Sequence, residues 1–248
     1  MTTYAGAEEW VPHDGGMRKL RASLGNCRGC DLWEEAEQAV PGEGPVRARM
    51  MIVGESPGDH EDKEGHVFVG PAGRLLDRAM AEAGIDRSEI YLTNAVKHFR
   101  FERDGKRRIH KTPSAGHITA CHPWLARELE IVKPALVVIM GAVAARSLIG
   151  PSFRVTQHRG EKVELPDGTA AIATVHPSAV VRSQDPRSLE AVAAEPDHRY
   201  QQRHDDQHGH GAAPLARAGG IQKIASSSKS VGSVFSVNPR NSRGWEYR

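Results

Sequence analysis

A single histidine, His110, lies within a strongly basic segment, which reads GKRRIHKTPS from residue 105 to residue 114. An imidazole titrates near neutral pH, so it can serve as a base or, in its neutral form, as a nucleophile. Basic neighbours disfavour its protonated form. An isolated histidine in a polar loop is more often a solvated residue. The role of His110 therefore depends on what the rest of the chain brings near it.

Polar residues follow each apolar segment that reads as a strand. Glu55 follows RMMIVG, and His176 follows AAIATV. Asn94 and His98 close the segment that begins IYLT. Carboxyl ends of parallel strands share one edge of an α/β sheet, and ligands bind there. Each residue alone has an ordinary explanation, such as a cap or a turn, but their coincidence predicts one cleft.

The chemistry of this cleft favours a pyrimidine ligand. The Asn94 carboxamide offers a donor beside an acceptor, which matches a base edge that carries N3–H and O4 and rejects cytosine. Phe68, in HVFVGPAG, offers a stacking face, although an ordinary core aromatic is the alternative. The segment SPGD, with Gly58 and Asp59, offers backbone N–H groups to a base oxygen.

The basic segment predicts contacts with phosphate. Seven lysines and arginines lie between residues 97 and 111, among them Lys106, Arg107 and Arg108. Such clusters bind the backbone of nucleic acids. A charged, solvated hairpin is the alternative.

Three cysteines indicate a metal site rather than a disulfide framework. Cys27 and Cys30 form CRGC, and Cys121 lies far downstream. His98 is the natural fourth ligand, and a Cys3His set suits zinc or an iron–sulfur cluster. Free thiols, with Cys121 buried in its helix, are a further alternative.

The elements that position these residues predict an α/β fold. Near-continuous apolar runs at 49–54, 90–96, 134–141 and 170–178 are typical of buried parallel strands. Helical patterns over 71–84 and from about residue 114 alternate with them. We expect a three-layer sandwich around a four-stranded, mostly parallel sheet. The sequence Pro-Asp-Gly at 166–168 predicts a hairpin turn before the last strand.

Composition sets the outer limits of the interpretation. The 248 residues are 39% apolar and carry a formal net charge of +2, so any nucleic-acid site must rest on local clustering. No apolar run approaches the roughly 18 residues of a membrane span. We expect a monomeric cytoplasmic protein with one α/β domain over residues 11–182. Residues 183–248, which are rich in Gln, His, Gly and Ser, predict a disordered tail.

The motifs resemble a known family. GESPG, FVGPAGRLLD, YLTNAVKH, CRGC and IATVHPS are similar, in this order, to motifs of the family-4 uracil-DNA glycosylases, which carry a 4Fe–4S cluster. The resemblance covers about residues 11–182. KRRIH and the histidine that ends TNAVKH resemble the UdgX subfamily, in which a loop histidine becomes covalently attached to the abasic site. The resemblance implies uracil-containing DNA as partner and favours the iron–sulfur cluster over zinc.

The resemblance also implies residue roles. Its cluster ligands correspond to Cys27, Cys30, His98 and Cys121. Its base-contacting residues correspond to Asn94, Phe68, Gly58 and Asp59, and its DNA-backbone contacts to Lys106, Arg107, Arg108 and Ser178. Its catalytic groups correspond to Glu55, His176 and the nucleophile His110. Ser56 departs from the glutamine of that subfamily, and the tail departs from the family's closing amphipathic helix.

Three functions follow from these residues. The first is a glycosylase that excises uracil, preferably from single-stranded DNA where base flipping costs least. In this enzyme His110 traps the sugar cation and stays attached. The second is a turnover glycosylase of the same fold, in which His110 only shapes its loop. The third is a metal-stabilised DNA-binding module without catalysis.

Overall fold

A five-stranded sheet forms the centre of the molecule, in the order β2-β1-β5-β7-β6. The computed structural model describes residues 3–182, so the predicted tail lies outside the described residues. Four strands run parallel, and one edge strand is antiparallel. The parallel strands are β1 (Met50–Gly54), β2 (Tyr91–Asn94), β5 (Leu136–Met140) and β7 (Ala170–Thr174).

The fifth strand corrects the prediction of a four-stranded sheet. Strand β6 (Lys162–Glu164) pairs with β7 through the predicted Pro-Asp-Gly turn. Its exposed and half-buried residues give only a short, polar pattern, which is why it did not read as a strand. The strands of the parallel sheet also end earlier than expected, because the chain turns at residues 95–98 and enters helix α6 (Pro177–Arg182).

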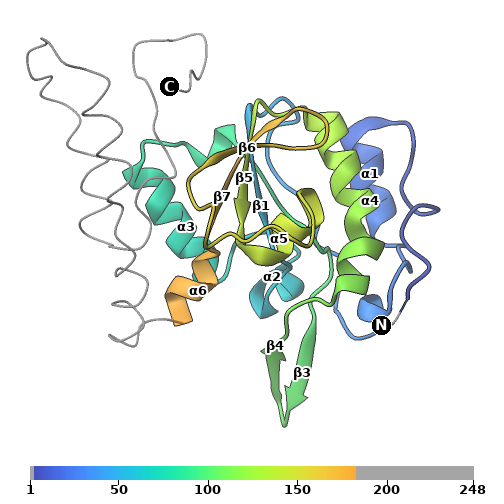
Figure 1. Cartoon of the computed structure of the whole chain (residues 1–248). Coiled ribbons are helices and arrows are strands. Elements are labelled where there is room, and N and C mark those ends of the chain that lie inside the picture. The colour runs from blue at the N-terminus through green and yellow to red at the C-terminus, as the bar shows by residue number, and fades with distance from the viewer. Residues whose placement is uncertain (1–2, 183–248) are drawn as a thin grey trace, which may run out of the picture.

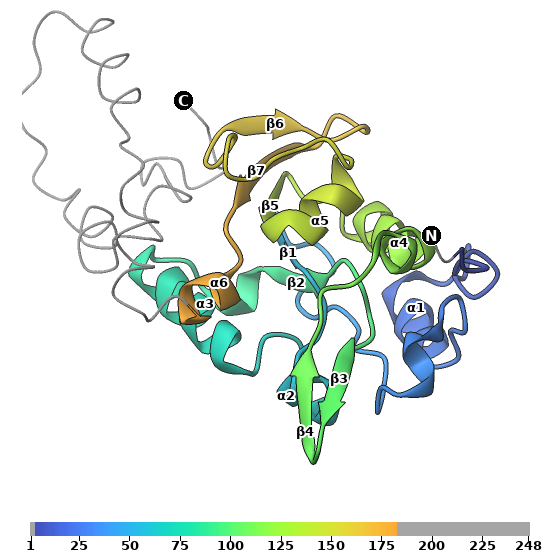
Figure 2. The same ribbon diagram turned by 60° about the horizontal axis from the view of Figure 1, so that its bottom comes forward.

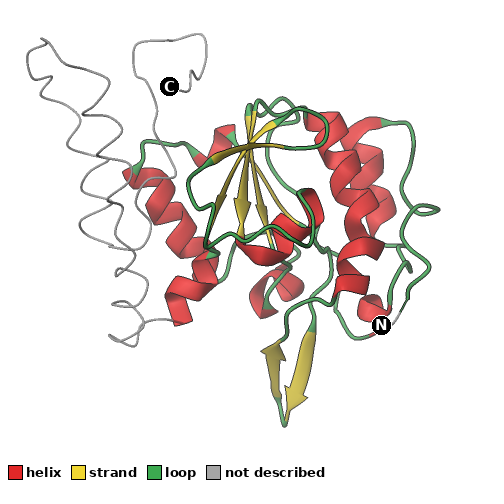
Figure 3. Cartoon of the chain, in the orientation of Figure 1, coloured by secondary structure: helices red, strands yellow, loops and turns green. Residues whose placement is uncertain are grey.

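Helices cover both faces of the sheet, as the alternating pattern predicts (Figure 3). Helix α3 (Pro71–Glu82) begins with Pro71 in its first turn, and α4 (Ala115–Val132) is capped by Ser114, whose side chain accepts the His117 N–H. The sequence did not predict α1 (Gly16–Leu24), α5 (Gly141–Leu148) or the 3-10 turns η1 (Asp31–Glu34) and η2 (Arg87–Glu89).

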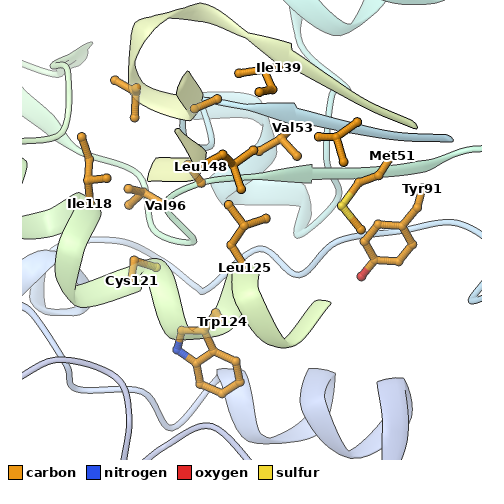
Figure 4. Close-up of a cluster of buried hydrophobic side chains, with 14 of the residues drawn as sticks. Met51, Val53, Tyr91, Val96, Ile118, Cys121, Trp124, Leu125, Ile139 and Leu148 are labelled. Carbon is orange, nitrogen blue, oxygen red and sulfur yellow. The ribbon is translucent and has the colours of Figure 1, made fainter. Parts of the chain in front are cut away.

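The two faces of the sheet bury separate apolar clusters. Figure 1 shows α1, α4 and α5 on one side of the sheet and α3 with α6 on the other. The first side buries Trp124 and Leu125 of α4 against Val53 and Ile139 of the strands (Figure 4). The second side buries Leu76 and Met80 of α3. The three-layer sandwich is therefore confirmed.

A two-stranded hairpin projects from this body next to the short helix α2 (Asp59–Glu64). Its strands are β3 (Phe101–Asp104) and β4 (Arg107–His110), and Figure 2 shows it beyond the end of the sheet. Gly105 opens the two-residue turn with φ 56°, a positive value that such turns require. None of the helices between residues 3 and 182 has the length and apolarity needed to span a membrane.

Candidate active site

The hairpin brings His110 to the end of β1. The Nε2 atom of His110 lies 3.7 Å from Glu55 Oε1 and 3.3 Å from Ser56 Oγ. The ring also contacts Phe99, with 5.9 Å between ring centroids. Residues 54 positions apart in the chain thus meet because β4 runs back toward the sheet. A carboxylate, a hydroxyl and an imidazole nitrogen share one small region.

An arginine of the hairpin anchors it to the body. Arg108 donates from Nε to Asp59 Oδ1 and from Nη1 to Asp62 Oδ2, both at 2.6 Å. Its Nη1 also lies 3.3 Å from Glu37 Oε1, and its side chain is only 8% exposed. Arg108 and His110 project from the same face of β4, since side chains alternate along a strand. The ion pairs that hold Arg108 therefore also orient His110.

The remaining predicted phosphate contacts differ from Arg108. Lys106 and Arg107 are exposed and line a polar groove between the hairpin and α2. Neither forms an ion pair with a carboxylate of the described residues, whereas Arg108 pairs with Asp59 and Asp62. The charge of Arg108 is already balanced by the buried Asp62 and by the more exposed Asp59 and Glu37, so the positive charge of KRRIH that is available to a ligand lies on Lys106 and Arg107.

Asn94 and Phe68 meet at the end of β1, where Gly54 leaves room for both. A Cβ atom at Gly54 would lie 2.5 Å from Asn94 Oδ1 and 2.7 Å from Phe68 Cζ. Phe68 has φ 55°, which is unusual for a residue with a side chain. Gly73 permits this conformation, because a Cβ atom there would lie 1.8 Å from the Phe68 carbonyl oxygen. A strained backbone conformation therefore holds the ring of Phe68 beside the carboxamide of Asn94.

His176 has a defined protonation pattern. The Ser178 backbone N–H donates to His176 Nδ1 at 3.2 Å, so Nδ1 is an acceptor. Burial lowers the pKa of His176 to about 4, with Arg182 and His110 adding to the effect. The neutral ring must then carry its hydrogen on Nε2. Because that atom is buried without a partner, a donor is held ready for a ligand acceptor.

Three of the predicted site residues each bury a polar atom without a hydrogen-bond partner. These atoms are Glu55 Oε1, Asn94 Oδ1 and His176 Nε2. Unsatisfied buried polar atoms cost free energy, and native proteins contain few of them. They come from the ends of β1, β2 and β7, the edge at which an α/β sheet binds ligands. The site is complementary to a molecule that supplies both donors and acceptors.

Arg182 is a member of this site that sequence reasoning missed. Its charge lowers the pKa of Glu55, of His110 and of His176, although burial is the largest influence on each. Burial raises the pKa of Glu55 and lowers that of His110. Basic neighbours were expected to keep His110 neutral. They do lower its pKa, but burial has the larger effect. Arg182 ends α6, six positions after His176, and no spacing pattern marked it.

Three of the predicted metal ligands, Cys27, Cys30 and Cys121, lie near one another, and the fourth, His98, follows Lys97, which contacts Cys121. We call these four residues the cysteine site. Cys121 Sγ accepts the Lys97 backbone N–H at 3.3 Å, and Cys27 Sγ accepts the Trp124 indole N–H at 3.2 Å. Burial raises the pKa of Cys121 to about 12, and the nearby thiols Cys30 and Cys27 raise it further. Within residues 3–182, no three His, Cys, Asp or Glu side chains form a group that could hold a single metal ion.

A buried ion pair, Lys97 with Glu128, lies between the cysteine site and Asn94. Lys97 Nζ donates to Glu128 Oε2 at 2.7 Å, to Thr93 Oγ1 at 2.7 Å and to the Asn94 carbonyl at 2.8 Å. Glu128 also accepts from the Tyr91 hydroxyl. Lys97, counted with the basic segment in the sequence, is 1% exposed and unavailable to DNA.

Comparison with known proteins agrees with this geometry. A family model described as the uracil DNA glycosylase superfamily matches residues 41–195. The chain belongs to the uracil DNA glycosylase superfamily. A type-4 uracil-DNA glycosylase of Pyrobaculum aerophilum is 34% identical over 173 residues, which are 67% of this chain and 85% of that protein. One of Thermotoga maritima is 35% identical over 169 residues, 68% of this chain and 84% of its own.

A third type-4 uracil-DNA glycosylase, from Sulfurisphaera tokodaii, is 37% identical over 150 residues. These residues are 58% of this chain and 65% of that protein, just under two thirds of its length. Membership of this superfamily makes the chain an enzyme of the uracil-DNA glycosylase class, a hydrolase. The interpretation as a DNA-binding module without catalysis is therefore set aside.

Proposed function

We propose that this protein excises uracil from DNA and remains covalently attached to the abasic site through His110. The observation that carries the proposal is the set of three unpartnered buried atoms, on Glu55, Asn94 and His176, beside the imidazole of His110. Single-stranded DNA is the proposed preferred substrate, because extrusion of a base from a duplex costs additional free energy. The protein is proposed to act as a monomer in the cytoplasm.

Uracil recognition falls to Asn94 and Phe68 in this proposal. The Asn94 Oδ1 atom accepts the uracil N3–H, and the amide nitrogen donates to O4. The ring of Phe68 stacks on the base. The backbone N–H of Asp59 completes the contact to the base. Gly58, predicted with it, has its N–H engaged by Glu61 and its carbonyl by Asp62, and the Asp59 carboxylate is engaged by Arg108 and Lys63.

Departure of uracil leaves negative charge on the base and positive charge on the sugar. The Nε2–H of His176 donates to the oxygen on which the negative charge develops, and a donor aimed at such an atom lowers the barrier. The neutral ring of His110 carries its hydrogen on Nε2 in this proposal, and that nitrogen forms a bond to the sugar carbon from which uracil has left. Glu55, 3.7 Å from Nε2, orients the ring and accepts the Nε2 hydrogen as the bond forms, so the attached ring is neutral and the carboxyl is protonated.

DNA binding outside the base falls to Lys106, Arg107 and Ser178. Their side chains reach solvent, and cationic contacts to phosphate supply affinity without sequence preference. Arg108 is assigned a different role, because its contacts with Asp59 and Asp62 hold the hairpin against α2.

The cysteine site is assigned to a 4Fe–4S cluster rather than zinc, because CRGC and TNAVKH resemble the cluster-binding motifs of the family-4 enzymes. Its three thiols influence one another electrostatically, so they lie close enough to serve one cofactor. Cys27, Cys30, Cys121 and His98 would hold it, and the pKa of His98, lowered to about 4 by burial, keeps that ring neutral. A bound cluster would cross-link the segment before η1 to α4 and to the end of β2.

The decisive experiment uses a labelled single-stranded oligonucleotide with one uracil. The purified protein is mixed with it, denatured in detergent with heat and run on a denaturing gel. A retarded band that is absent with a thymine control supports the covalent product. Strand cleavage by alkali without a retarded band would instead support the turnover glycosylase.

The variant His110→Ser separates the two functions. The covalent mechanism requires that the retarded band disappears while free uracil is released repeatedly. If the wild-type protein gives neither a retarded band nor strand cleavage by alkali, the proposed function is overturned. Broad visible absorption with iron and sulfide in equal amounts supports the cluster, whereas a colourless protein that contains zinc contradicts it.

A further inference from the structure

Glu61 is a buried carboxylate to which the proposed reaction gives no role. It lies on α2 and is 8% exposed. Its Oε2 atom accepts the Gly58 N–H at 3.0 Å, and its Oε1 atom accepts the Gly70 N–H at 2.8 Å. The two glycines belong to different loops. Gly58 ends the loop that follows β1, and Gly70 ends the loop that carries Phe68, so one carboxylate joins both loops.

The carboxylate also explains why both positions are glycine. Gly58 has φ −97° and Gly70 has φ −77°, values that any residue adopts. A Cβ atom at Gly58 would lie 2.7 Å from Glu61 Oε2, and one at Gly70 would lie 3.0 Å from Glu61 Oε1. Close approach of the Glu61 oxygens, not backbone conformation, therefore favours glycine, because a Cβ atom at either position would displace the carboxylate from its hydrogen bond.

The two joined loops both border the proposed base site. The first runs from Glu55 to Gly58, and the second carries Phe68 at φ 55° two residues before Gly70. The ring of Phe68 and the carboxamide of Asn94 meet over Gly54, at the start of the first loop. A shift of one loop relative to the other therefore changes the space into which a planar base must fit.

We infer that Glu61 is a positioning residue for base recognition, which fixes the separation of the two loops through both carboxylate oxygens. The inference rests on the proposed function, because that function assigns the space between Phe68 and Asn94 to uracil. A carboxylate is the group that this task requires, since two backbone N–H donors must be satisfied by one side chain of this length. Hydrogen bonds to a charged acceptor are also stronger than neutral ones.

The test is Glu61→Gln, which keeps the size of the side chain and removes one acceptor. The NH2 group of glutamine cannot accept from an N–H donor, so one loop loses its anchor. Single-turnover excision is measured against oligonucleotide concentration, which separates apparent affinity from maximal rate. We expect the half-saturating concentration to rise about tenfold, equivalent to about 1.4 kcal/mol, and the maximal rate to change less than about threefold. Glu64→Gln, on the same helix but exposed, is the matched control and leaves both values unchanged.

A second variant keeps the inference open to refutation if Glu61→Gln does not fold. Gly70→Ala places a methyl group against the Glu61 carboxylate and is expected to weaken apparent affinity to a similar extent. The double variant is expected to fall well short of the sum of the two effects, because both disturb one contact. Unchanged affinity in the folded variants, or additive effects, overturns the inference. Failure of the wild-type protein to excise uracil overturns the proposed function itself and is seen before any variant is made.

Discussion

The imidazole of His110 and the carboxylate of Glu55 lie 3.7 Å apart at the end of β1, although 54 residues lie between them in the sequence. Ser56 Oγ contacts the same imidazole nitrogen at 3.3 Å. Ser56 replaces the glutamine expected from the UdgX resemblance, and its hydroxyl still reaches His110. The geometry of the pair therefore does not require the longer side chain.

Glu55→Gln is expected to slow covalent attachment by about 100-fold, the usual range for loss of a general base. Burial raises the pKa of Glu55, so the wild-type rate should fall on the acidic side at a pH above the normal range for glutamate. The measurement is the single-turnover rate of adduct formation from about pH 4.5 to pH 8. An identical pH profile in the variant would show that another group supplies the base.

The same variant is expected to be more stable than the wild-type protein at neutral pH. The folded-state pKa of Glu55 lies above its unfolded value, so its stabilising contribution is fully present below the unfolded pKa. That contribution is lost as the pH rises through the folded-state pKa, where the buried group becomes charged. Urea unfolding of both proteins at pH 4.5 and pH 8 checks the sign. A wild-type protein that gains stability relative to the variant as pH rises would contradict it.

His176→Ala is expected to lower the rate of uracil release by about 100- to 1000-fold, because it removes a donor aimed at the leaving base. Ser178→Ala should cost less than about fivefold, since the Ser178 backbone N–H still holds Nδ1 as an acceptor. Release of labelled uracil in the His110→Ser background isolates this step from trapping. Equal losses in the two variants would mean that the hydroxyl, rather than the backbone, fixes the tautomer.

Lys97→Met and Glu128→Leu should each lower the free energy of unfolding by about 3–5 kcal/mol, because each leaves a buried charge without its partner. The double variant should recover much of that loss. Urea denaturation of the four proteins completes the cycle. Purely additive losses would show that the two charges do not stabilise each other.

Lys106→Ala and Arg107→Ala should each reduce the salt dependence of DNA binding by about 0.7 in slope, as expected for one contact to a single strand. Arg108→Ala should leave the slope nearly unchanged and cost about 3 kcal/mol of stability, because Asp62 loses its cation. Fluorescence anisotropy with a thymine-containing oligonucleotide, across a range of salt concentrations, measures the slopes without covalent attachment. A reduced slope in Arg108→Ala would place that residue among the phosphate contacts.

The order of elements and the edge that carries the chemistry could be predicted from the sequence. Continuous apolar runs specify buried parallel strands, and the polar residues that follow them must share one sheet edge, because parallel strands end together. For this reason Glu55, Asn94 and His176 were expected in one cleft. Strand β6 and helix α5 were missed, because a three-residue polar strand and a short, alanine-rich helix carry little periodicity.

Tertiary structure alone decided which of two neighbouring arginines faces the protein. Arg107 and Arg108 read alike in the sequence, but alternation along β4 directs one to solvent and the other to Asp59 and Asp62. Tertiary structure also decided the main cause of the lowered pKa values of His110 and His176, which is burial; from the sequence, only basic neighbours were expected to keep His110 neutral. Sequence specifies residue types and local periodicity. Depth of burial and the identity of charge partners arise only when distant segments pack together.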